Sequence, residues 1–166
     1  CLWCEKTVFE KRGESFELMA TYVATLDEKT SSVKIENRQV GRPVSSSQQP
    51  VKRPLVLAPT FPMMNEAFLK QDAPTLTVQG LVSPSTGGFQ LYEMNVKKLG
   101  EQMVAVPGRE NRLAQKISIV PDVGIFSSFA PTSIFFHEPQ APFRFLSYEG
   151  LESGMGTPSV IVYLPD

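Results

Sequence analysis

One stretch decides the fold class, residues 16–26, with the sequence Phe16-Glu17-Leu18-Met19-Ala20-Thr21-Tyr22-Val23-Ala24-Thr25-Leu26. Its even-numbered side chains are all apolar or aromatic, whereas the odd-numbered positions mix Glu, Met, Thr and Val. A period of two over eleven residues predicts a long β-strand whose even positions line a hydrophobic core. Turn residues at 27–30 and a second β-prone run at 32–40 predict that the chain then folds back as a neighbouring strand.

The rest of the chain repeats this alternation of short β-prone runs and turn residues. Fourteen prolines and eleven glycines separate the runs, which favours many short strands over long helices. We therefore expect an all-β or mainly β protein, a two-sheet sandwich or jelly-roll-like fold of about 9–11 short strands. One short helix is predicted at residues 62–71, where Pro62 lies near the first turn and apolar residues follow at helical spacing.

Length and composition predict the domain organisation. With 166 residues, of which 42% are hydrophobic and 20% charged, the chain suits one globular domain. We assign residues 1–14 to an N-terminal tether or extended segment and residues 15–166 to a single β-sandwich domain. Residues 41–53, rich in Ser, Gln and Pro, predict a long loop. The continuous apolar run at 159–164 predicts a central strand that is covered on both faces.

The charge pattern argues against nucleic acid as a partner. The net charge is −1, and the basic residues occur as scattered pairs rather than as a stripe that could neutralise phosphates. No phosphate loop, dinucleotide fingerprint or calcium loop occurs, so we expect no cofactor and no metal. The longest apolar runs have five or six residues, too few to cross a bilayer.

Candidate catalytic residues are scarce. The single histidine, His137, is followed by Glu138, and such a pair could supply a general base. Nucleophilic catalysis also needs a nucleophile on a strained turn and an oxyanion hole, and residues 150–156 lack the spacing of a nucleophile elbow. We therefore expect no catalytic residues and a protein that is not an enzyme.

The first four residues, Cys1-Leu2-Trp3-Cys4, bear on the cellular location. A leading cysteine exposed by processing is typical of a bacterial lipoprotein, so Cys1 is a candidate lipid-attachment residue and the only predicted route to a membrane. The alternatives are another proteolytic cut or a piece of a longer chain. Cys1 and Cys4 also form a candidate disulfide, whereas a zinc site would need two further ligands.

The aromatic C-terminal region predicts a protein contact. Phe135 and Phe136 are adjacent on a predicted strand, so one of them must face away from the core. An outward aromatic side chain beside Pro-rich turns is a candidate partner contact, and coverage by another loop of the same chain is the alternative. The candidate contacts are Phe135, Phe136, His137, Phe143 and Tyr148.

Three hypotheses for the function follow. The first is a non-enzymatic, exported structural or assembly protein of the cell envelope, anchored at the outer membrane through Cys1, that binds neighbouring protein subunits through loops and sheet edges. The second is a viral or phage jelly-roll protein at the capsid or particle surface. The third is a carbohydrate- or small-ligand-binding β module. Because Trp3 lies outside the predicted sheets, its stacking residues would be Tyr22, Tyr92, Tyr148 and Tyr163.

Overall fold

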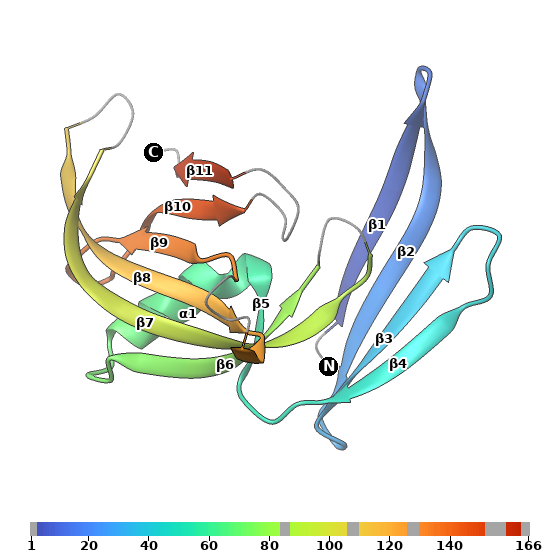
Figure 1. Ribbon diagram of the computed structural model, residues 1–166, viewed down its shortest axis with the longest axis horizontal. Coiled ribbons are helices and arrows are strands. Elements are labelled where there is room, and N and C mark those ends of the chain that lie inside the picture. The colour runs from blue at the N-terminus through green and yellow to red at the C-terminus, as the bar shows by residue number, and fades with distance from the viewer. Residues whose placement is uncertain (1–2, 84–86, 106–109, 126–129, 152–158, 164–166) are drawn as a thin grey trace.

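The chain folds into two β-sheets and one short α-helix, as the computed structural model shows for residues 3–83, 87–105, 110–125, 130–151 and 159–163 (Figure 1). The prediction of a mainly β, two-sheet protein is confirmed. One sheet has the order β1-β2-β3-β4 and contains β1 (Trp3–Arg12), β2 (Ser15–Asp27), β3 (Ser32–Gln39) and β4 (Ser45–Pro50). The other has the order β11-β10-β9-β8-β7-β6-β5 and contains β5 (Leu55–Leu57), β6 (Thr75–Val82), β7 (Gln90–Val104), β8 (Arg112–Asp122), β9 (Ser133–His137), β10 (Phe145–Leu151) and β11 (Ser159–Tyr163).

Strands adjacent in the sequence are adjacent in both sheets, and apart from the parallel pair β5–β6 the strands form antiparallel meanders. The described strand order lacks the Greek-key crossovers of a jelly roll, and it therefore favours the sandwich among the predicted architectures. The parallel pair β5–β6 is joined by a short 3₁₀ turn, η1 (Ala58–Thr60), and by helix α1 (Phe61–Leu69). A crossover of this kind is what a parallel pair requires. The helix predicted at 62–71 is confirmed, with Pro62 in its first turn.

Helix α1 packs on one face of the seven-stranded sheet and builds the larger core. Phe61 and Phe68 of the helix are buried against side chains from β6, β7, β8 and β9. The ring of Phe61 meets that of Phe135 edge-on, with 6.2 Å between the ring centroids. The sheet residues of this core are Val78, Met94, Val96, Ile117, Ile119 and Phe135.

The four-stranded sheet packs on the opposite face of the seven-stranded sheet, near β5, β6 and the start of β7. Its inward side chains are Ala20, Tyr22, Ala24, Val33 and Ile35, and they meet Leu81 and Phe89. The even positions of the period-two stretch therefore line a core from residue 20 to residue 24, as predicted. Leu26 is partly buried at the margin of the same core.

Four sequence-based predictions need correction. Phe16 and Leu18 are exposed, because β3 pairs with β2 only from Ala20 onward and no second sheet covers the strand before that point. Residues 41–53 are not a continuous loop, since β4 adds to the edge of β3. The apolar strand β11 lies at the edge of its sheet rather than at the centre. The boundary drawn between residues 14 and 15 falls inside the β1–β2 hairpin, so both predicted parts share one sheet.

A glycine at the contact between the sheets supplies a test of this packing. A β-carbon built on Gly88 would lie 2.5 Å from Cδ1 of the Tyr22 ring, a distance that forces the ring or the backbone to move. We expect Gly88→Ala to lower the free energy of unfolding by about 1–3 kcal/mol, measured by urea denaturation. In a Tyr22→Ala background, Gly88→Ala should lower the free energy of unfolding much less. An equal cost in both backgrounds would show that the ring does not limit the space at residue 88.

Candidate functional site

The aromatic residues predicted to contact a partner belong to the interior. Phe135 and Phe136 do point to opposite faces, but both are buried, Phe135 under α1 and Phe136 beside Val104 and Ala114. Both rings are covered within the same chain, but by helix α1 and by neighbouring strands rather than by another loop. Phe143 and Tyr148 are half-buried, and the Tyr148 hydroxyl donates a hydrogen bond to the Leu151 carbonyl at 2.8 Å. Burial of Phe135, Phe136 and His137 corrects the prediction that they lie at a partner interface.

His137 lies wholly inside the protein. Its Nδ1 donates to the backbone carbonyl of Phe143 at 2.8 Å, and its Nε2 is buried with no hydrogen-bond partner among the described residues. Burial lowers the pKa of His137, against smaller opposing effects of the Phe143 hydrogen bond and the charge of Glu66. A neutral imidazole without solvent exposure does not have the access that a general base needs.

The predicted cysteine chemistry rests partly on a residue outside the described ones. Cys1 is not described, so its lipidation and its disulfide with Cys4 stay predictions. Cys4 itself points inward from β1 and packs at the margin of the core between the sheets. Burial raises the pKa of the Cys4 thiol, which lowers its reactivity as a nucleophile.

Clusters of metal ligands and membrane-spanning helices are absent from the residues that the structure describes. There, no three His, Cys, Asp or Glu side chains gather closely enough to hold a metal ion. The helical segment found in these ranges lacks the length and apolar content needed to cross a membrane.

The β1–β2 hairpin extends past the end of β3 and stands out from the molecule (Figure 1). We call its projecting part, residues 9–18, the arm. Phe9 pairs with Leu18, and Lys11 pairs with Phe16, so these four side chains share one face. Exposure is 56% for Phe9, 68% for Phe16 and 46% for Leu18. Such fractions are unusual for large apolar side chains grouped on one element.

A bulge separates the buried part of the hairpin from the arm. The register shifts between Val8 and Phe9, because Val8 pairs with Ala20 whereas Phe9 pairs with Leu18 and Met19 is left over. An extra residue of this kind bends and twists a hairpin. The apolar periodicity at 16 and 18 therefore continues into a part of β2 that has no core to face. The sequence contained this signal, but it was interpreted as core.

The other face of the arm is charged. Arg12 Nε lies 3.0 Å from Glu10 Oε2, and Arg12 Nη1 lies 3.2 Å from Glu17 Oε2. Exposed ion pairs of this kind add little stability, about 0–1 kcal/mol each, but they keep one face solvated. The arm is thus amphipathic, with an unpaired apolar side and an ion-paired side.

No protein-family model, curated protein or solved structure matches this chain. Function must therefore be inferred from the residues themselves.

The buried histidine makes stability depend on pH. The pKa of His137 is lower in the folded than in the unfolded chain, so the unfolded chain binds more protons below the ordinary histidine pKa of about 6.5. We expect the free energy of unfolding to fall as the pH drops below about 6.5, by at most about 1.4 kcal/mol per pH unit from this group. Urea denaturation across this range measures it. His137→Gln should make the free energy of unfolding depend less on pH in this range. An unchanged dependence would contradict its assignment to His137.

Proposed function

We propose that this protein is a non-enzymatic assembly subunit that binds a neighbouring protein through the β1–β2 arm. The observation that carries the proposal is the amphipathic arm, with Phe9, Phe16 and Leu18 exposed on one face and an ion-paired cluster on the other. A contiguous apolar patch rimmed by charges is typical of a protein interface.

Open backbone edges add a second means of binding. On the β3 side, β2 is not paired before Ala20, and the Met19 carbonyl accepts from the Val40 amide at 3.0 Å. On the other side, β1 pairs with no described strand except β2. Strand edges with unsatisfied amides and carbonyls are templates for strand addition by a partner.

The size of the patch indicates what kind of partner fits. The exposed parts of Phe9, Phe16 and Leu18 amount to roughly 350 Å², judged from typical side-chain areas. A stable interface buries about 800 Å² on each partner, so two arms packed face to face would fall short. The partner that suits the arm is a different protein that offers an apolar groove and a strand edge together.

The arm is tested by site-specific photo-crosslinking in the native host. With p-benzoyl-phenylalanine at position 16, we expect one discrete protein adduct, because the side chain there is in the partner's groove. The same probe at Ile125, which is 87% exposed, is the matched control and should give none.

Loss of the arm's apolar face should remove this adduct. In the background Phe9→Ser with Leu18→Ser, we expect at least about 30-fold less of it, since two hot-spot side chains at about 1–2 kcal/mol each contribute about 2–4 kcal/mol together. Stability should change little, because both residues are exposed. Identical adducts at positions 16 and 125, or an adduct insensitive to the double substitution, would exclude the arm as the binding element.

A further inference from the structure

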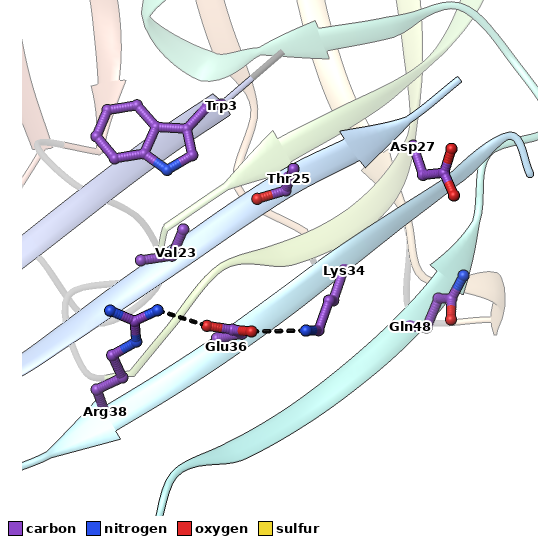
Figure 2. A pocket seen from close by; sticks show the side chains of 8 residues that line it. All are labelled: Trp3, Val23, Thr25, Asp27, Lys34, Glu36, Arg38 and Gln48. Atoms are coloured by element: carbon purple, nitrogen blue, oxygen red, sulfur yellow. Dashed lines mark hydrogen bonds and ion pairs between the residues drawn. The ribbon is translucent and has the colours of Figure 1, made fainter. Parts of the chain in front are cut away.

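A second surface feature lies on the four-stranded sheet, on the face turned away from the seven-stranded sheet. A shallow groove of about 490 Å³ lies there, lined by side chains from all four strands. Figure 2 shows these side chains. We call it the Trp3 groove. Its lining residues are Trp3 from β1, Val23, Thr25 and Asp27 from β2, Lys34, Glu36 and Arg38 from β3, and Gln48 from β4.

The register of the sheet brings these residues together. Trp3 pairs with Thr25, Thr25 with Lys34, and Lys34 with Gln48, so one line of side chains crosses the sheet. Trp3 is 59% exposed and stands at the edge strand as a wall of the groove. Val23, only 8% exposed, forms an apolar floor next to it. Trp3 thus lies in a sheet, contrary to the sequence-based expectation that placed it outside.

An ion-paired triplet holds the polar side of the groove in place. Glu36 lies between two cations of its own strand, with 2.7 Å from Lys34 Nζ to one carboxylate oxygen and 2.7 Å from Arg38 Nη2 to the other. Hydrogen bonds from Lys34 and Arg38 lower the pKa of Glu36 to about 2, so its carboxylate stays ionised at any physiological pH. The triplet therefore offers an ionised carboxylate between two exposed cations.

The groove carries no excess charge. Lys34 and Arg38 are balanced by Glu36 and Asp27, so neither an anion nor a cation gains from net electrostatic attraction. Thr25 and Gln48 add a hydroxyl and an amide, both able to donate and accept hydrogen bonds. A ligand suited to this lining is uncharged and has many hydroxyl groups and one flat apolar face.

We propose that the Trp3 groove binds an uncharged saccharide. An indole ring packs against the C–H face of a pyranose, while the ring hydroxyls bond to carboxylate, guanidinium and amide groups beside it. The volume of the groove lies within the range of small-ligand sites. The proposal is independent of the arm, because the two surfaces share no residue.

Trp3 is the single tryptophan of the chain, so its fluorescence reports directly on the groove. Three uncharged probes are titrated into the full chain: maltotriose, cellotriose and N,N′,N″-triacetylchitotriose. We expect at least one of them to shift the emission to shorter wavelength in a saturable manner, because a stacked sugar excludes water from the indole. Half-saturation should fall near 1 mM, the level of roughly 4 kcal/mol of binding.

Variants locate the site by two-dimensional NMR titration, which does not depend on tryptophan. Trp3→Ala should weaken binding at least tenfold, and Glu36→Gln should weaken it several-fold by releasing Lys34 and Arg38. Ile161→Ala, on the edge strand of the other sheet and 58% exposed, is the matched control and should bind like the unmodified protein.

Three results would overturn the saccharide proposal. The first is no saturable response to any of the three probes up to about 20 mM, where even weak sites fill. The second is full binding by Trp3→Ala. The third is binding of a sulfated heparin trisaccharide alone, lost with added salt, which would show an anion site instead of a neutral one.

Discussion

The packing of the four-stranded sheet on β6 and β7 is the contact on which the rest of the structure depends. Tyr22, Val33 and Ile35 face Leu81 and Phe89 across the space between the sheets, and Gly88 approaches the Tyr22 ring too closely for a larger residue. A small antiparallel sheet is marginal when neither face is covered. Covering one face stabilises it and leaves the other in solvent.

Because of this packing, the two sheets have different surroundings. The seven-stranded sheet has α1 on one face and the small sheet on part of the other, and the residues at both contacts are buried, whereas Leu99, Met103 and Ile161 are exposed. The small sheet carries both surface features considered above, the arm beyond β3 and the Trp3 groove on its solvent face. A core that supports a sheet with one open face is well suited to binding, because rigid strands hold exposed side chains in register.

The buried histidine, His137, also lies away from the two surface features of the small sheet. His137 hydrogen-bonds to the Phe143 carbonyl and packs against the Phe145 ring, with 5.6 Å between the ring centroids. Asn65 of α1 is buried as well, and neither polar atom of its side chain has a hydrogen-bond partner among the described residues. Buried polar groups of this kind are costly, and these two lie in the interior rather than in the Trp3 groove. The two proposed binding surfaces consist of exposed aromatic and ion-paired residues instead.

Local pattern was sufficient to predict elements such as β2 and α1, but it missed β4. The period-two stretch at 16–26 predicted a strand, and Pro62 with the apolar residues after it predicted α1, because both signals come from side chains a few residues apart. The period-two pattern predicted burial correctly only where the other sheet covers the strand, as at Ala20, Tyr22 and Ala24. The same pattern continues through Phe16 and Leu18, but these side chains are exposed to solvent because β3 pairs with β2 only from Ala20 onward.

The tertiary structure decided which residues pack against each face of a strand. Phe135 and Phe136 are both buried because different parts of the chain cover the two sides of β9, and β11 is an edge strand although its sequence is continuously apolar. Trp3 enters the groove only through pairing with Thr25, a residue twenty-two positions away. The alternation of side chains along a strand is a local property of the backbone, whereas the partner of each face depends on chain segments distant in sequence.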